Sequence, residues 1–233
     1  MTEEEKQLML NAAKDFVRER IAPNHIRNTQ KLRSLGEFNI NPFLEKYLAQ
    51  FAFGDASSQS MARVLIYARA LGTSITTSFG TNMQYFCNDV LSSFASTTSG
   101  IDIEYIDVED GQRKYCQVKA GPNTINKDDV PVIKEHFRGV MNLGRTNGLR
   151  ITSGDCVVGV LYGTSDELSS HYKKIAEDYP VLIGKDFWYH LTGDLNFYDD
   201  LINAFGEVAG EFDSSELLEQ TVQYLAEEIE NQD

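Results

Sequence analysis

The sequence is poor in cysteine and proline and has no long apolar run, and these shortages exclude several classes of protein. Its three cysteines are scattered and form no CxxC or CxxH spacing, which argues against a zinc site or a disulfide-stapled fold. No apolar stretch approaches the roughly 20 residues that span a bilayer. The first residues are acidic, whereas a signal peptide begins with basic ones. We therefore expect a cytoplasmic protein without a membrane partner.

Basic residues are scarce in the last third of the chain. Residues 1–153 hold 18 Lys and Arg against 17 Asp and Glu, and residues 154–233 hold 3 against 18, which together give the net charge of -14. A surface that contacts phosphate could therefore be assembled only from the first two thirds. The acidic end would face away from a polyanion, or it is simply a solvated helix pair that aids solubility.

The first hundred residues repeat apolar side chains at the spacing of amphipathic helices. The apolar positions between Leu10 and Ile21 share one helical face, and Pro23 is expected to end that helix. The stretch Gly72–Gly80 is small and rich in hydroxyl groups, so we expect a loop or a short strand there. Further helices are expected at residues 43–51, at 61–71 with Ser60 as its cap, and at 83–94.

From residue 101 onward the apolar period changes to that of strands. Residues 101–108 and 113–120 alternate around the turn dipeptide Asp110-Gly111, and residues 156–162 form an apolar run typical of a doubly covered strand. Helices are expected at 130–141, 167–178, 186–191, 195–205 and 215–230, and a strand at 181–183. This order predicts an α/β fold in which helices flank a mixed sheet. A helical N-terminal region, 1–58, would precede a core, 59–233, with an acidic helical end.

The hairpin around Asp110-Gly111 gathers charged side chains on one face. If these residues form a two-residue type I′ turn, Asp102 lies opposite Lys119. The same register places Glu104 opposite Gln117, and all four side chains share a face because strand side chains alternate. The other face is apolar and suited to a core: Ile101, Ile103, Tyr105, Cys116, Val118 and Ala120.

Such a cluster suits the hydrolysis of phosphodiester bonds. Mg²⁺ would take oxygen ligands from Asp102 and a neighbouring carboxylate, lower the pKa of a bound water and neutralise charge on the phosphate. Lys119 would orient or deprotonate the water, or hold the developing negative charge. The plain structural alternative is a cross-strand ion pair between Asp102 and Lys119 on an exposed polar face.

These residues resemble the signature of PD-(D/E)XK nucleases, which stands here as Gly100-Ile101-Asp102 and Gln117-Val118-Lys119. Longer stretches resemble the PmeII-like type II restriction endonucleases, and the likeness extends from about Phe38 to Tyr198: residues 38–43, 63–74, 99–106, 115–129 and 184–188. The resemblance implies a restriction-endonuclease-like core for residues 59–233 and Mg²⁺-dependent cleavage of double-stranded DNA. It also implies a G/C-rich palindromic site with an unspecified central base.

The resemblance also implies roles for individual residues. Asp102, Glu104, Gln117 and Lys119 are the expected catalytic residues, and Asp102, Glu104 and Val118 are the expected metal ligands. Gln117 stands where a Glu or Asp is usual, so Glu104 is expected to substitute as the second carboxylate while Gln117 offers a carbonyl oxygen. Two alternatives stay open: a less specific Mrr-like or repair nuclease, and a DNA-binding module without activity.

Three groups of polar residues are candidates for DNA contact, since Arg, Lys, Asn and Gln read bases and backbone amides favour phosphate. The groups are Thr124, Asn126 and Lys127 after the catalytic strand; Arg145, Asn147 and Arg150 after the next helix; and Arg27, Lys31 and Arg33 in an early basic stretch. A palindrome is read most simply by a two-fold dimer, so we expect a homodimer. A methyltransferase acting on the same site is a further expected partner. Trp188 is expected to pack in a core rather than at that interface.

Overall fold

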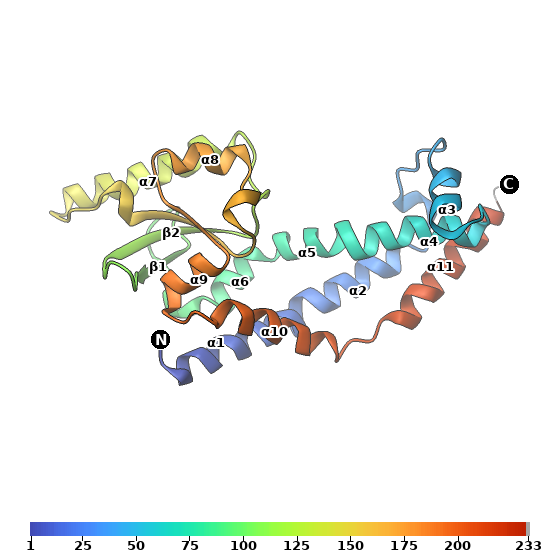
Figure 1. Ribbon diagram of the computed structural model, residues 1–233, viewed down its shortest axis with the longest axis horizontal. Coiled ribbons are helices and arrows are strands. Elements are labelled where there is room, and N and C mark those ends of the chain that lie inside the picture. Colours follow the sequence, from blue (N-terminus) through green and yellow to red (C-terminus); the bar gives the residue numbers. More distant parts are fainter. Residues whose placement is uncertain (232–233) are drawn as a thin grey trace. The chain divides into compact units, whose positions relative to one another are not determined.

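The computed structural model describes residues 1–231 and divides into two compact units. The sheet unit consists of Met1–Phe16 and Met83–Gly206 (Figure 1). The helical unit consists of Val17–Asn82 and the segment that begins at Glu207. The boundary expected between residues 58 and 59 falls inside the helical unit. That residues 1–58 contact DNA stays a prediction.

Helices make up most of the described structure. The α-helices are α1 (Glu3–Phe16), α2 (Ala22–Lys31), α3 (Glu45–Phe53), α4 (Ser58–Ala68), α5 (Ile75–Thr81), α6 (Met83–Asp89), α7 (Asp129–Thr146), α8 (Ser170–Ala176), α9 (Lys185–Thr192), α10 (Phe197–Ala209) and α11 (Ser215–Glu230). Among the described residues, no helix has both the length and the apolar character needed to cross a bilayer.

The sheet unit is built on a four-stranded mixed sheet with the strand order β1-β2-β3-β4. Its strands are β1 (Ile103–Ile106), β2 (Arg113–Lys119), β3 (Cys156–Val160) and β4 (Val181–Ile183). β1 and β2 form an antiparallel hairpin, whereas β2, β3 and β4 are parallel and are connected through α7 and α8. The expected mixed sheet flanked by helices is confirmed, with each strand near its predicted bounds.

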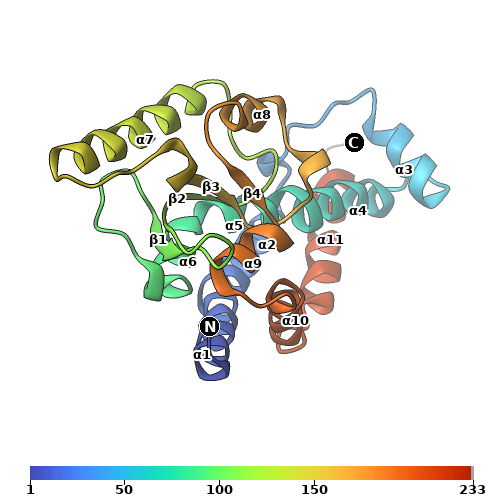
Figure 2. The ribbon, with the colours of Figure 1, turned by 60° about the vertical axis from the view of Figure 1, so that its left-hand side comes forward.

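Helices cover both faces of this sheet, with α7 and α8 on one side and α6 and α9 on the other (Figures 1 and 2). Every residue of β3 is buried, as predicted for a doubly covered strand. Trp188 of α9 is fully buried and its indole Nε1 donates to the carbonyl of Leu161 at 2.9 Å, which confirms that it is a packing residue. The hairpin of β1 and β2 is thus packed on both sides toward its β3 edge.

The helix expected to end at Pro23 does not end there. A π-helical turn, Val17–Ile21, follows α1, and Pro23 lies in the first turn of α2. A proline is tolerated at this position because the first N–H groups of a helix have no intrahelical acceptor. The wider π turn therefore lets the chain continue as helix past a residue that normally breaks one.

The segment Gly72–Gly80, predicted as a loop or strand, is helical and forms part of a π turn (Arg69–Ser74) and α5. Two of its hydroxyl groups form hydrogen bonds, one within the helix and one with a neighbouring helix. The Thr76 hydroxyl donates to the carbonyl of Gly72 at 3.0 Å, and buried Ser78 accepts a hydrogen bond of 2.7 Å from Asn24 of α2. Tertiary packing here overrides the low helix propensity of the segment.

The core of the helical unit lies between α4 and α11. Ile66 of α4 and Leu225 of α11 are fully buried in it. The N-terminus of α4 is capped by Ser57, whose side chain accepts from the backbone of Ser60 at 3.3 Å, so the prediction that Ser60 is the cap is wrong by one turn.

Candidate active site

The hairpin pairs Glu104 with Tyr115 and Ile106 with Arg113, so the predicted register is wrong by two residues. Asp102 does not lie opposite Lys119, and Glu104 does not lie opposite Gln117. The reason is a longer loop: the backbone N–H of Asp107 donates to the carbonyl of Gln112 at 2.9 Å, which leaves four residues between them. A type I′ turn needs positive φ at both central residues, and among the described residues only glycines, including Gly111, have positive φ.

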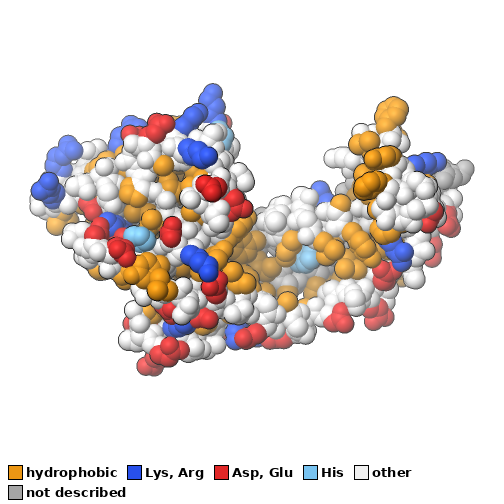
Figure 3. All heavy atoms as spheres, in the orientation of Figure 1, with side chains coloured by type: hydrophobic (Ala, Val, Ile, Leu, Met, Phe, Trp, Pro, Cys, Tyr) orange, Lys and Arg blue, Asp and Glu red, His pale blue; other side chains and the backbone are white. Residues whose placement is uncertain are grey.

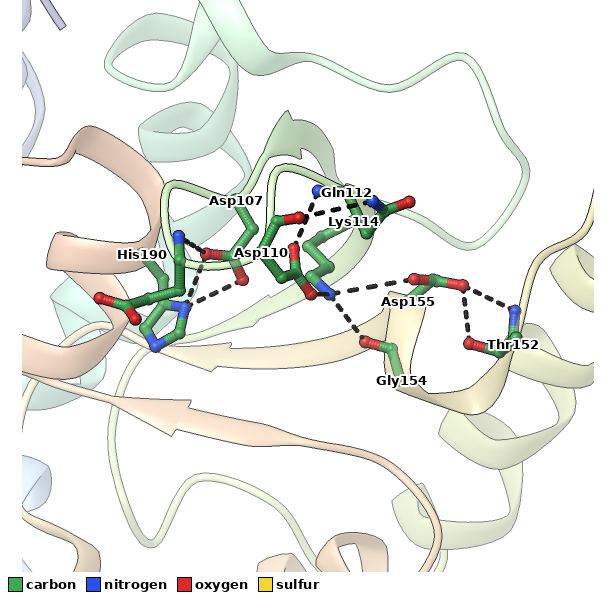
Figure 4. Close-up of polar contacts among 9 residues, drawn as sticks. Asp107, Asp110, Gln112, Lys114, Thr152, Gly154, Asp155 and His190 are labelled. Atoms are coloured by element: carbon green, nitrogen blue, oxygen red, sulfur yellow. Dashed lines mark hydrogen bonds and ion pairs between the residues drawn. The ribbon is translucent and has the colours of Figure 1, made fainter.

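This longer loop is held in place by the side chain of His190, on α9. The carboxylate of Asp107 is buried, and its Oδ1 accepts from the backbone N–H of Glu109 at 3.0 Å. The Nδ1 atom of His190, on α9, lies 2.8 Å from the same oxygen (Figure 4). The backbone of Val108 adds a hydrogen bond to the carbonyl of His190 at 3.3 Å. The hairpin loop is therefore shaped by contacts with α9 rather than by its own dipeptide.

Lys114 anchors the other side of the loop. Its ammonium lies 2.5 Å from the carboxylate of Asp110 and 3.1 Å from the carbonyl of Gly154, with Asp155 at 3.9 Å (Figure 4). The hydrogen bond from Lys114 is the main reason that the pKa of Asp110 lies below its ordinary value. The buried ammonium of Lys114 is therefore already paired with these groups, so Lys114 stabilises the loop and is not a candidate for catalysis.

A shift of two residues leaves the faces of the hairpin unchanged, because side chains alternate with period two. Glu104, Gln117 and Lys119 therefore share one face, as predicted. Gln117 and Lys119 are aligned with Val158 and Val160 of β3, which belong to the core under α7 and α8. The polar face is thus half covered, and Gln117 is only 4% exposed.

Asp102 lies just before β1, with its carboxylate against the backbone of β2. Its Oδ2 accepts a hydrogen bond of 2.7 Å from the N–H of Val118. Pairing between β1 and β2 stops at Ile103, which lies opposite Cys116. The N–H of Val118 therefore has no partner in β1 and donates to the carboxylate of Asp102 instead. This bond places the charge of Asp102 beside the residue that precedes Lys119.

Lys119 is half-buried, and it forms no ion pair or hydrogen bond through its side chain with any other described residue. A simple cross-strand pair with Asp102 is therefore not what the structure contains. Both charges nevertheless act on the buried thiol of Cys87. The pKa of Cys87 is raised to about 12, mainly by burial; the charge of Asp102 adds to the rise and the charge of Lys119 opposes it.

Glu104 is committed to the segment that precedes β1. Its Oε1 accepts from the hydroxyls of Ser96 at 2.6 Å and Thr98 at 2.9 Å, and its Oε2 lies 3.1 Å from the guanidinium of Arg113. Partial burial raises the pKa of Glu104, but these hydrogen bonds and the charge of Arg113 outweigh it, so its pKa lies below the ordinary value. Its negative charge is therefore shared among three donors.

The oxygen donors next to Lys119 are of mixed kind. The described residues contain no group of three His, Cys, Asp or Glu side chains placed to hold a metal ion. Three oxygen donors belong to this part of the chain: the carboxylate of Asp102, which binds the N–H of Val118, the side-chain carbonyl of Gln117, and the backbone carbonyl of Val118, which lies on the same side of the strand as its N–H. Mg²⁺ prefers oxygen ligands and often needs only one or two carboxylates, with water and phosphate completing its shell. The donor chemistry fits this ion.

The first group of predicted DNA contacts is partly used by the fold. The hydroxyl of Thr124 lies between the carbonyl of Gly121 and the hydroxyl of Tyr172. The side-chain carbonyl of Asn126 accepts from the backbone N–H groups of Asp128 and Asp129 just before and at the start of α7, so that oxygen is already used by the fold. Lys127 is exposed. Of these three, Lys127 keeps its whole polar group for a ligand.

The other two groups lie in different units. Arg145, Asn147 and Arg150 are exposed around the C-terminal end of α7, where Lys and Arg side chains gather (Figure 3). Arg27 and Lys31 are exposed on α2 of the helical unit. The guanidinium of Arg33 packs over the ring of Tyr224 at 4.9 Å. Whether any of them contacts DNA stays a prediction.

The family model for the type II restriction endonuclease EcoO109I matches residues 11–213, which include the whole sheet and the four helices that cover it. The chain belongs to this family. No individual curated protein matches it. Membership confirms a restriction endonuclease, hence a nuclease that acts on DNA, and the α/β sheet flanked by helices is its restriction-endonuclease-like core. The likeness to the PmeII-like group stays a prediction.

One residue that contacts the candidate site was not predicted from the sequence. His136 of α7 places its Nδ1 atom 2.7 Å from the amide nitrogen of Gln117. It follows the end of β2 by 17 residues, on a helix whose apolar stripe gives no sign of a polar contact. The one signal in the sequence was Gly100, two residues before Asp102, because a glycine there leaves room for the imidazole.

Proposed function

We propose that this protein is a site-specific, Mg²⁺-dependent nuclease that hydrolyses both strands of DNA at a G/C-rich palindrome and leaves 5′-phosphate and 3′-hydroxyl ends. The observation that carries the proposal is the arrangement at the end of β2. A half-buried Lys119 without a protein partner among the described residues follows the strand residue whose N–H binds Asp102. A lysine kept partly out of water and unpaired is a group prepared for a substrate charge.

Asp102, Gln117 and Val118 would hold Mg²⁺ through their oxygen atoms, and the ion would supply charge neutralisation on the phosphate and an activated water. The hydrogen bond from Val118 fixes the carboxylate of Asp102 in position. Lys119 orients the attacking water or donates to the phosphate oxygen on which negative charge develops. The exposed cations Lys127, Arg145 and Arg150 would hold the DNA backbone.

The assignment of Glu104 as the second metal carboxylate stays a prediction, and Glu104→Gln tests it. The glutamine carbonyl can still accept from Ser96 and Thr98, so the segment before β1 should keep its place while the negative charge is lost. If Glu104 serves the metal, we expect cleavage to fall by about 10- to 100-fold and to need more Mg²⁺. Initial rates of plasmid cleavage across a Mg²⁺ titration measure this. Unchanged rates at every Mg²⁺ concentration would exclude the role.

A palindrome calls for a two-fold dimer, and α3 offers a surface suited to one. Phe43 is 89% exposed in the turn before α3, and Tyr47 and Phe51 on α3 are 60% and 78% exposed. Figure 3 shows hydrophobic side chains gathered over this part of the helical unit. Tyr47 and Phe51 are spaced by four residues and stack on one face of α3, and Phe43 precedes them by the same spacing. In an antiparallel pair of these helices, Phe43 of one copy would meet Phe51 of the other around Tyr47, so the face is self-complementary.

The double substitution Phe43→Ser with Phe51→Ser is expected to convert the dimer to a monomer without loss of helix content. The reason is that large exposed aromatic side chains contribute strongly to interfaces but little to the fold of their own chain. Sedimentation velocity and circular dichroism measure the two properties. The control Leu195→Ser, at a site that is 72% exposed in the sheet unit, should leave the dimer intact. A double variant that sediments like the wild type would rule out this interface.

Two other functions are separated from this one by digestion of defined DNA. A less specific Mrr-like or repair nuclease would give ends without a shared sequence, and a DNA-binding module without activity would shift DNA but leave it uncut. Recurring ends at one palindrome support the proposal. We also propose that a methyltransferase protects the same palindrome. The nuclease would act in the cytoplasm.

A further inference from the structure

The side-chain amide of Gln117 is held from two directions. Its Nε2 lies 2.5 Å from the backbone carbonyl of Gly100 and 2.7 Å from Nδ1 of His136. Within the described part of the chain, its carbonyl oxygen accepts no hydrogen bond. Gln117 as a whole is only 4% exposed, so neither contact is easily exchanged for water.

The chemistry of Gly100 settles which end of the amide faces which partner. A backbone carbonyl can only accept, so the group that approaches it at 2.5 Å must be the NH₂ end. The second hydrogen of that NH₂ then points to His136, which must accept through Nδ1 and carry its own proton on Nε2. Both amide hydrogens are thereby used, and the carbonyl oxygen is turned away from both acceptors.

His136 is itself placed by packing. Its neighbours on α7, Ile133 and Phe137, are buried in the core against β3. Gly100 has a φ of 77°, and a side chain there would place its Cβ 2.6 Å from the imidazole ring. A positive φ and this close contact both require glycine. The imidazole therefore rests on the backbone of Gly100, and both acceptors of the amide are part of one rigid contact.

We propose that His136 is a positioning residue that fixes Gln117 so that its carbonyl oxygen acts as a neutral ligand in place of the usual carboxylate. The inference rests on the proposed function and deepens it. A glutamate at 117 would place an oxygen against the carbonyl of Gly100, two acceptors facing each other, so the pocket selects an amide. The replacement of the usual Glu or Asp by Gln117 is thus accompanied by a matching acceptor, His136, on α7.

The test compares His136→Leu, which removes the acceptor, with His136→Asn, whose side-chain oxygen can take the place of Nδ1. Two quantities are measured: the Mg²⁺ concentration for half-maximal DNA cleavage, and binding of Mn²⁺ to the protein with uncleaved DNA by electron paramagnetic resonance. His136→Leu is expected to weaken both by about 10- to 100-fold at an unchanged melting temperature. His136→Asn is expected to restore them toward the wild type.

Each variant is repeated in a Gln117→Ala background. If His136 acts only through Gln117, His136→Leu will cause no further loss there. An equal loss in both backgrounds, or a loss seen only in the melting temperature, would overturn the positioning role while leaving the nuclease proposal intact. A wild-type protein that neither binds Mn²⁺ nor cuts DNA would instead overturn the proposed function, and the role of His136 with it.

Discussion

Asp102→Asn is expected to lower DNA cleavage by about 10³-fold, because it removes a charge that the transition state requires. The asparagine carbonyl can still accept the hydrogen bond from Val118, so the end of β2 should keep its geometry. Apart from this bond, no described residue uses the carboxylate. Single-turnover rates in Mg²⁺ give the loss, and mobility shifts in Ca²⁺ should show unchanged or tighter binding of DNA.

A matched control is Asp166→Asn, because Asp166 is exposed and acidic in the same unit. It should cleave as the wild type does. If Asp102→Asn also cleaved within a few-fold of the wild type, the carboxylate would not be part of the reaction. A large loss in melting temperature in Asp102→Asn would assign the residue to the fold of the hairpin instead.

Lys119→Met is expected to lower cleavage by about 10²- to 10⁴-fold, since the ammonium that serves the water or the phosphate is lost. Methionine replaces the aliphatic stem, so packing of this half-buried side chain is kept. Since Lys119 has no ion pair among the described residues, its removal should not destabilise the protein. Rates under single turnover and thermal unfolding separate these two effects.

Lys114→Met on the same strand should behave in the opposite way. Lys114 is buried against Asp110, Asp155 and the carbonyl of Gly154, so its loss leaves partners unpaired and lowers the melting temperature. Its cleavage below that temperature should stay close to the wild type. If Lys119→Met lost stability instead of rate, and Lys114→Met lost rate instead of stability, the roles assigned to the two lysines would be reversed.

The faces of the hairpin could be predicted from the sequence, but the register could not. Alternation is local, so Glu104, Gln117 and Lys119 fall on one face for any even shift. The loop length is decided by His190, far along the chain, whose imidazole holds Asp107. A local turn signal such as Asp110-Gly111 cannot reflect a contact with a residue so distant in the sequence.

The helices show the same limit of local signals. The period of apolar residues located α7 and α11 well, because each has one packed face. Pro23 and the segment Gly72–Gly80 were misjudged because π turns and hydrogen bonds between helices accommodate them. His136 was missed for a related reason: its partner Gln117 lies on another element, and only the folded chain joins them.

The most direct measurement is digestion of a large DNA of known sequence in Mg²⁺, with sequencing of every end, by the wild type and by Asp102→Asn and Lys119→Met. The wild type should give discrete fragments whose ends share one palindrome, and neither variant should do so at comparable times. Equal digestion by all three proteins would contradict an active site at the end of β2.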